Sequence, residues 1–334
     1  MHNKQNPASN VAIHSISMFM NEKDEQCQIW SNYETDDACL TGSVNLTNLV
    51  TTETLSVTDI PGDYEHCGAV CTGGRTYVVY TAYDDRQKAI FLLIIGEDVP
   101  KDKIQLTDWG KFDFPSICVH QSKVVVSWEN FSQTNSQIEY VIVGDDEPLN
   151  IQQATSCQER AYQPQMISNG DTLFLVYESF FQKRYHLMVR MLEDSHHRFS
   201  EAVEIGFDTL NDLSPSLWCQ DGEIYVSWEN SSPLYTDYVW KNHKGTDVTM
   251  PAFGHGWQVL CKMGFRKLGF DGETLTISSL DTDWNAELEL NNAESAGEPV
   301  VFMVGEFTYL AYVTKAEQSH CWKLVIQALN GSMW

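Results

Sequence analysis

The sequence predicts an all-β protein, a six-bladed β-propeller built from four-stranded blades of about 50 residues. Three observations support this. Two nearly identical strings, VVVSWEN at 124–130 and IYVSWEN at 224–230, belong to a pattern that recurs along the chain. An aromatic residue returns at almost constant spacing within that pattern. The apolar segments are short and bounded by turn residues, with no helical period over a useful length.

The aromatic residue, called the anchor below, occurs once in each repeat. Its intervals are 50, 48, 49, 51 and 84 residues, for Trp30, Tyr80, Trp128, Tyr177, Trp228 and Tyr312. A proline lies thirteen residues before four of these anchors, at Pro115, Pro164, Pro215 and Pro299. Six anchors predict six blades. Because Trp128, Tyr177 and Trp228 have apolar neighbours within a strand, we expect these three to pack in the core and not to form repeated binding sites.

Each repeat divides into four strands, called a, b, c and d. In the third repeat these are SICVH, KVVVSWE, IEYVIV and IQQAT, and in the fourth Asn169-Gly170 marks an a–b hairpin turn. The last repeat shows only three strands, so we expect the residues around Val11–His14 to supply its fourth strand and close the ring. All blades form one domain over 1–334, with blades near 11–60, 61–108, 109–157, 158–207, 208–290 and 291–334.

The fifth blade carries extra residues. The interval of 84 residues before Tyr312 exceeds the others by about 34. Strands c and d, expected at 257–265 and 274–280, place the excess in two insertions, 230–256 and 281–298. In this topology the b–c loops and the d–a connections emerge on the same face. Long loops gathered on one face usually carry function, so we expect the site there.

Composition narrows the choice of partners. The 334 residues include 21 Lys+Arg and 46 Asp+Glu, for a formal net charge of −25, which argues against nucleic acid and anionic membranes. The N-terminus is polar and no apolar stretch is long enough to span a membrane. The nine cysteines are scattered without a CxxC pair, which favours free thiols and a cytoplasmic protein. Oligomeric state stays open.

The repeat pattern resembles the sialidase-type (BNR-like) β-propellers. The residues that carry this resemblance are the proline, the apolar strand, a strand ending Val-x-Trp/Tyr-Glu and the following YHLMVR at 185–190. It covers roughly 11–330 and implies the fold and the handling of glycans. The family's Asp-box, S-x-D-x-G-x-x-W, is absent, and none of the seven arginines matches the sialidase arginine triad. The resemblance therefore implies no catalytic residue.

A glutamate follows the anchor in three consecutive blades, at Glu129, Glu178 and Glu229. Strand b ends on the expected face, so blade rotation should relate the three carboxylates. They could hold a Ca²⁺ ion, bind sugar hydroxyls or form an acid/base pair. They could equally close a strand and cap a turn, since repeats also copy structural residues. No motif indicates a cofactor or a metal site.

Residues just before the first proline or glycine of each blade belong to the same rim: Glu65, His66, Asp113, Tyr162, Gln163, Ser214 and Glu298. Carboxyl groups in different environments can divide acid and base roles. We therefore assign as catalytic candidates Asp113, Glu178 and Glu229. The substrate-binding candidates, including aromatics that can stack on a sugar, are His66, Glu129, Arg160, Tyr162, Gln163, His255, Trp257 and Trp284. We place His186 on the opposite face.

The expected function is recognition of a neutral or non-anionic glycan, with cleavage by a glycoside hydrolase or lyase mechanism as its catalytic form. The net charge of −25 would repel anionic sugars. Two alternatives stay open: a non-catalytic protein-interaction scaffold, and an enzyme acting on a non-sugar small molecule. The sequence does not separate enzyme, lectin and scaffold.

Overall fold

The structure is a computed structural model. It describes residues 11–231 apart from short gaps at 37–38, 59–61, 85, 97–101, 133, 145–148, 194–197, 207–210 and 221. Beyond residue 231 it describes 261–270, 275–279, 295–296, 300–304, 307–315 and 322–328. In these ranges no helix is long and apolar enough to cross a membrane.

The described residues are all-β and form six antiparallel sheets. The first two sheets comprise β1 (Val11–Met20), β2 (Gln26–Asp36), β3 (Cys39–Asn48) and β4 (Thr54–Ser56), then β5 (Asp63–Thr72), β6 (Arg75–Asp84), β7 (Gln87–Gly96) and β8 (Asp102–Gln105). The third comprises β9 (Phe112–His120), β10 (Lys123–Asn130), β11 (Gln137–Val143) and β12 (Gln152–Gln153).

The fourth sheet has one additional short strand. It comprises β13 (Ala161–Ser168), β14 (Leu173–Phe181), β15 (Arg184–Glu193), β16 (Arg198–Phe199) and β17 (Val203–Glu204). The last two sheets comprise β18 (Asn211–Gln220), β19 (Glu223–Ser231), β20 (Cys261–Phe270) and β21 (Leu275–Ser279), then β22 (Ser295–Ala296), β23 (Val300–Val304), β24 (Phe307–Lys315) and β25 (Trp322–Ala328).

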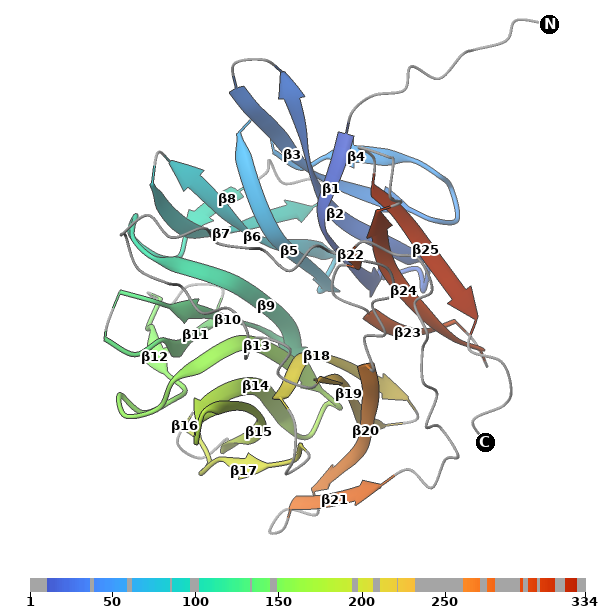
Figure 1. The fold of residues 1–334 in the computed structure, drawn as a ribbon. Helices are drawn as coiled ribbons and strands as arrows, with labels where there is room; N and C mark the ends of the chain where they lie inside the picture. Colours follow the sequence, from blue (N-terminus) through green and yellow to red (C-terminus); the bar gives the residue numbers. More distant parts are fainter. Residues whose placement is uncertain are drawn as a thin grey trace, which may run out of the picture.

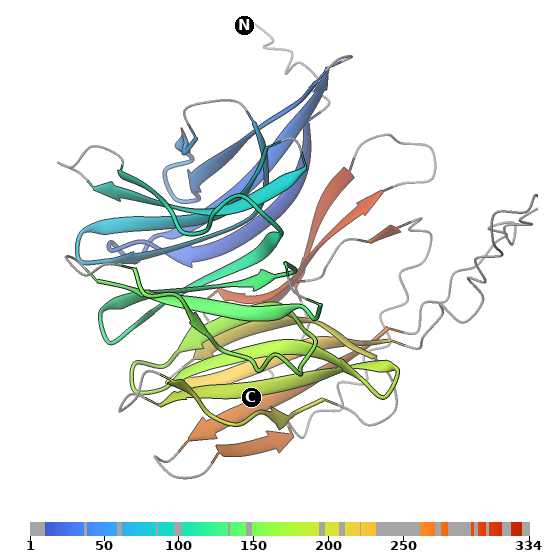
Figure 2. The same cartoon turned by 90° about the vertical axis from the view of Figure 1, so that its left-hand side faces the viewer.

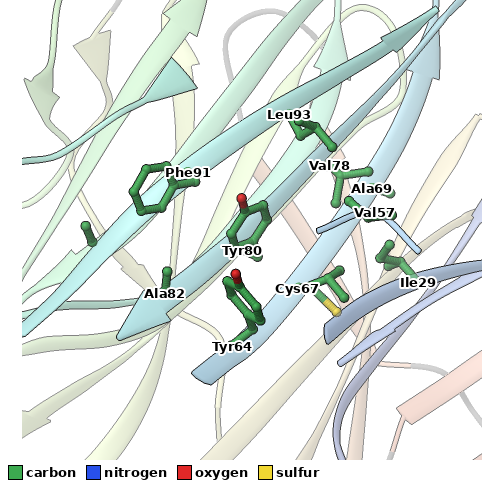
Figure 3. Packing of buried hydrophobic residues seen from close by; sticks show 12 residues of the cluster. Ile29, Val57, Tyr64, Cys67, Ala69, Val78, Tyr80, Ala82, Phe91 and Leu93 are labelled. Carbon is green, nitrogen blue, oxygen red and sulfur yellow. The ribbon is translucent and has the colours of Figure 1, made fainter. Parts of the chain in front are cut away.

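The sheets follow one another around a common centre in sequence order (Figure 1). Their first strands touch in succession, β1 with β5, β5 with β9, β9 with β13, β13 with β18 and β18 with β23. Neighbouring sheets lie face to face (Figure 2). Apolar side chains from both faces fill the space between them, as Tyr64, Tyr80 and Phe91 do beside the first sheet (Figure 3). The core therefore consists of layers between consecutive sheets.

Trp128, Tyr177 and Trp228 lie in these layers and are completely buried, so the expectation that they pack in the core is confirmed. Tyr80 is also buried, whereas Trp30 is half-buried, and the side chain of Tyr312 lies outside the described residues. The polar atoms of Trp128 and Tyr177 are satisfied inside the protein. The Trp128 indole N–H donates to Glu139 at 3.0 Å, and the Tyr177 hydroxyl donates to Glu159 at 3.0 Å. Buried Trp and Tyr usually find such partners.

The expectation that the residues around Val11–His14 supply the fourth strand of the last repeat is wrong. Val11, Ala12 and Ile13 pair with Glu34, Tyr33 and Asn32 inside the first sheet, as part of its strand a. The turn between β1 and β2 is held locally, with Asn21 N–H donating to the Glu25 carbonyl at 3.0 Å. A hairpin with the next strand brings together residues close in sequence, and this outweighs pairing with the far end of the chain.

Candidate functional site

One irregularity repeats at the start of strand a in the second to fifth sheets. The register of β5, β9, β13 and β18 shifts so that two residues face one anchor. The second residue of each pair is Cys67, Pro115, Pro164 or Pro215. Proline has no N–H to donate, and a bulge is where a strand tolerates it. This explains the constant spacing of proline and anchor in the sequence.

The first residue of each pair, called the bulge residue below, has a left-handed backbone. Its φ is +40° at His66, +50° at Phe114, +47° at Gln163 and +53° at Ser214. All four are half-buried, whereas the Pro or Cys that follows is buried. Left-handed backbone in a residue with a side chain costs on the order of 1 kcal/mol or more. Four consecutive sheets thus hold a strained residue at the same place.

Carboxylates hold the backbones of three bulge residues. Glu129 Oε2 accepts from the Gln163 N–H at 3.2 Å, and Glu178 Oε1 accepts from the Ser214 N–H at 2.7 Å. Each glutamate thereby links its sheet to the next. At the preceding junction Asp113 Oδ1 accepts from its neighbour's N–H, that of Phe114, at 2.9 Å. It also accepts at 3.1 Å from Thr81, the residue that follows anchor Tyr80.

Asp113 is the centre of a charged group that includes two residues of the second sheet. His66 Nδ1 lies 2.8 Å from its Oδ1, and the Lys88 ammonium donates to its Oδ2. Burial acts to raise the pKa of Asp113, but hydrogen bonds and charge from His66 and Lys88 outweigh it and lower that pKa to about 2. Asp113 is therefore an ionised carboxylate near neutral pH.

Glu65 extends this charged group. The Lys88 ammonium lies 3.4 Å from Glu65 Oε2, and the Tyr83 hydroxyl donates to the same oxygen. Burial, followed by that hydrogen bond and the Glu65 charge, raises the pKa of Tyr83, so its proton is retained. One lysine thus contacts two carboxylates, Glu65 and Asp113, and its single positive charge offsets one of their two negative charges.

The pKa of Glu129 is raised, whereas that of Asp113 is lowered. Its Cα pairs with that of Asp113 across β9 and β10, and its side chain is completely buried. Burial raises the pKa of Glu129 to about 7, against the hydrogen bonds from Ser136 Oγ (2.5 Å) and the Gln163 N–H. Asp113 and Glu129 therefore face each other across two strands, one ionised and one with its pKa raised to about 7.

Aromatic side chains lie beside the pair Asp113 and Glu129. The ring centroids of His66 and Phe114 are 4.2 Å apart, and those of Tyr162 and Tyr185 are 5.7 Å apart. The pKa of Tyr162 is raised by burial and then by the charge of Glu129, which brings this ring into the same group. All four rings are half-buried. They offer apolar faces next to carboxyl groups, a combination that suits a sugar.

The structure brings together Asp113, Glu129 and the rim candidates His66, Tyr162 and Gln163. Glu178 faces Tyr162 across β13 and β14. The backbone of Glu229 faces Leu213 in the equivalent place. Arg160 is exposed just before β13 and donates through Nε to Asn135 at 3.2 Å. The side chain of Glu229, as well as His255, Trp257, Trp284, Glu298 and nearly all of the two insertions, lie outside the described residues.

His186 does not lie where the sequence predicted it. It faces Ser179, beside Glu178, and lies two residues inside the b–c end of β15, so its placement on the opposite face is wrong. Its Nδ1 lies 2.7 Å from Glu204 and its Nε2 lies 3.1 Å from the carbonyl oxygen of Phe181. The side chain is 1% exposed, so it braces the end of the hairpin from inside.

Sequence reasoning missed Lys88, Tyr83, Tyr185 and Ser136. The last two are unmarked in the repeat, because Tyr185 begins the YHLMVR strand and Ser136 lies in a variable b–c loop. A signal for the first two existed in the hairpin itself. Tyr83 and Lys88 face each other across β6 and β7, two positions from the b–c turn, at the end where site residues are expected.

In the described part of the chain, one group of three residues has atoms placed closely enough for a metal ion. Glu65, His66 and Asp113 offer donor atoms within 4.8 Å of one another. The Lys88 ammonium contacts both carboxylates of this group and supplies positive charge there. The arrangement is that of an ion-pair network, and the donor set alone does not make it a metal site.

Solved structures of glycosidases share this fold. The α-L-arabinofuranosidase of Fusarium graminearum, solved with an iminosugar inhibitor, has a TM-score of 0.56 and 8% identity over 96% of this chain and 94% of that one. The α-L-arabinanase of Penicillium chrysogenum, solved with arabinobiose, has 0.56 and 11% over 95% and 93%. The sialidase of Trypanosoma rangeli, solved with DANA, has 0.55 and 8% over 96% and 55%.

No family model and no curated protein matches the sequence. The chain spans about half the length of the sialidase that it resembles. At these identities the similarity shows the fold alone. The predicted resemblance to sialidase-type β-propellers is confirmed at that level, with the α-L-arabinofuranosidase and the α-L-arabinanase equally similar.

Proposed function

We propose that this protein is a six-bladed β-propeller that binds a neutral glycan on the face formed by the b–c loops and d–a connections. In this proposal each sheet is one blade, and the insertions of the fifth blade border the same face. The observation that carries it is the facing pair Asp113 and Glu129, with pKa values of about 2 and about 7. Half-buried His66 and Tyr162 lie beside this pair.

The charge of this face favours a neutral ligand. The described carboxyl groups of this face include Glu65, Asp113, Glu129 and Glu178. The described cations near them include Lys88, Arg160 and Arg184. Carboxylates together with the net charge of −25 repel an anionic sugar. Hydroxyl groups, by contrast, donate to carboxylates and accept from imidazole and amide groups.

Binding is the part of the function that the geometry supports best. Asp113, Glu129 and Glu178 are at most 3% exposed, whereas His66, Tyr162 and Gln163 next to them are half-buried and can be reached from outside. The buried carboxylates hold these neighbours in place. A rigid set of contacts lowers the entropy lost on binding.

Glycoside cleavage is the second candidate, and the split pKa values favour it. Asp113 is ionised and could act as base or nucleophile, while Glu129 retains a proton that it could donate to a leaving oxygen. Glu178, and Glu229 in the next blade, are further carboxyl groups at the equivalent position. Cleavage requires that a bound sugar reach the Asp113 and Glu129 carboxyl groups.

The test is binding of the purified protein to a glycan array, with and without EDTA, followed by product analysis of each hit. Asp113→Asn and Glu129→Gln should weaken binding, and they should abolish any turnover. Asp171→Asn is the matched control, because Asp171 is exposed at the opposite end of the fourth sheet. A retained ligand without product indicates a lectin. A blank array contradicts the proposal and favours the protein-interaction scaffold.

A further inference from the structure

Four consecutive sheets each hold a non-glycine residue with a left-handed backbone, a conformation that glycine adopts at lower cost. Glycine occupies positive-φ positions in three a–b hairpins, at Gly73, Gly74, Gly170 and Gly222, while the exposed a–b turn of the third sheet has Gln121 and Ser122. The four bulges, which are half-buried, carry no glycine and hold His66, Phe114, Gln163 and Ser214. Strained residues of this kind persist mainly where their side chains serve a function.

Core packing does not account for the side chains of Gln163 and Ser214, whereas His66 also hydrogen-bonds Asp113 and contacts the Phe114 ring. Each bulge residue is half-buried, and the residue that fills the core at the bulge is the following Cys67, Pro115, Pro164 or Pro215. Carboxylates bind the backbone N–H of Phe114, Gln163 and Ser214, not their side chains. The backbone is therefore fixed from the inside, while the side chain stays accessible.

The bulge residues occupy the same place on strands that touch in succession, β5 with β9, β9 with β13 and β13 with β18, and this series is called the arc below. The rings of His66 and Phe114 lie 4.2 Å apart with a tilt of 35°, so the first two contact directly. The arc begins with two rings and ends with an amide and a hydroxyl. A sugar ring has an apolar face, which can pack on aromatic rings, and an edge of hydroxyl groups, which can bind an amide and a hydroxyl.

We propose, on the basis of the function proposed above, that these four bulge residues form the ligand-contacting arc that sets specificity. His66 and Phe114 stack against the apolar face of one neutral sugar ring. Gln163 and Ser214 hydrogen-bond its hydroxyl groups. Asp113, Glu129 and Glu178 preorganise the arc through the backbone N–H groups.

Glycine substitution tests this proposal with little damage to the fold. Gln163→Gly and Ser214→Gly remove the side chain and relieve the strain, so the melting temperature should stay equal or rise. Each should weaken binding of the best neutral glycan about fivefold, the effect of one hydrogen bond. Phe114→Gly should weaken it about tenfold or more through lost stacking. The control is Ser122→Gly, which has a φ of +63° and lies in the exposed a–b turn of the third sheet.

Ser122→Gly should keep or raise the melting temperature in the same way and leave the affinity for the best neutral glycan unchanged. If Gln163→Gly and Ser214→Gly bind as the unmodified protein does, the arc is overturned while glycan binding stands. The arc is also overturned if these two variants lose stability and their folded fraction binds normally, since the side chains then serve packing. If the unmodified protein binds no neutral glycan, the proposed function fails first and the sugar-binding arc fails with it.

Discussion

Glu178 of the fourth sheet accepts a hydrogen bond from the backbone N–H of Ser214 in the fifth sheet at 2.7 Å. Glu129 makes the same contact with Gln163 one sheet earlier. The glutamate after the anchor is therefore a structural link between sheets and, at the same time, a neighbour of the rim residues Gln163 and Ser214. Its two roles can be separated by comparing amide and alanine variants.

Glu178→Ala should destabilise the protein by roughly 1–3 kcal/mol, because the Ser214 N–H loses its acceptor in a half-buried place. Glu178→Gln retains an acceptor oxygen and should cost clearly less. Chemical denaturation of both variants measures the difference. Equal free energies of unfolding for the two variants would contradict the link between sheets.

Glu129 should make stability fall as pH rises from about 4.5 to about 7. Its pKa is raised from 4.5 to about 7, so in this window the folded protein keeps a proton that the unfolded chain releases. The loss should total roughly 3 kcal/mol. It should be absent in Glu129→Gln, which still accepts from the Gln163 N–H. Identical pH profiles of the unfolding free energy for variant and unmodified protein would show that Glu129 ionises normally.

Lys88→Met should raise the pKa of Asp113. Asp113 contributes stability above pH 3.8 that is lost as pH falls toward its folded pKa of about 2, and Lys88 is one source of the lowering. Removing the ammonium should therefore move acid unfolding to higher pH. Lys123→Met is the control, since Lys123 is exposed at the opposite end of the third sheet. An equal shift in both variants would point to a general charge effect.

Arg190→Lys should cost roughly 3 kcal/mol of stability. The Arg190 side chain is largely buried; its Nε donates to the Tyr177 hydroxyl at 3.0 Å and its Nη1 donates to the Ser200 carbonyl at 2.6 Å. Its Nη2 reaches Glu159, which also accepts from Tyr177. Lysine cannot make three contacts in one plane. Arg160→Lys, at an exposed site, should change the unfolding free energy by less than about 0.5 kcal/mol. Similar costs for both would contradict the bracing role of Arg190.

The sequence was informative where the chain repeats itself. Most strands and the burial of Trp128, Tyr177 and Trp228 followed from the spacing of proline, anchor and glutamate. The common functional face of the rim residues stays a prediction. Structure was needed to show that the spacing places Phe114-Pro115 opposite Trp128 as a bulge. A pattern of residue types does not report a left-handed backbone at a position that glycine does not occupy.

Contacts that are not repeated could not be predicted. Lys88 reaches Asp113 from the neighbouring sheet, and this depends on which long side chain bridges the gap between two sheets. The pKa of Glu129 depends on its complete burial. The placement of Val11–His14 failed because a missing strand in the last repeat suggested closure, whereas hairpin pairing is local.

The most direct test of the central claim is calorimetric titration of the purified protein with neutral arabino-oligosaccharides and other neutral oligosaccharides, compared with sialic acid. We expect binding of at least one neutral oligosaccharide, loss of that binding in Asp113→Asn, and no binding of sialic acid. Binding of sialic acid alone would contradict the neutral specificity. Binding of a neutral sugar that is unchanged in Asp113→Asn, Glu129→Gln and Gln163→Gly would place the site elsewhere.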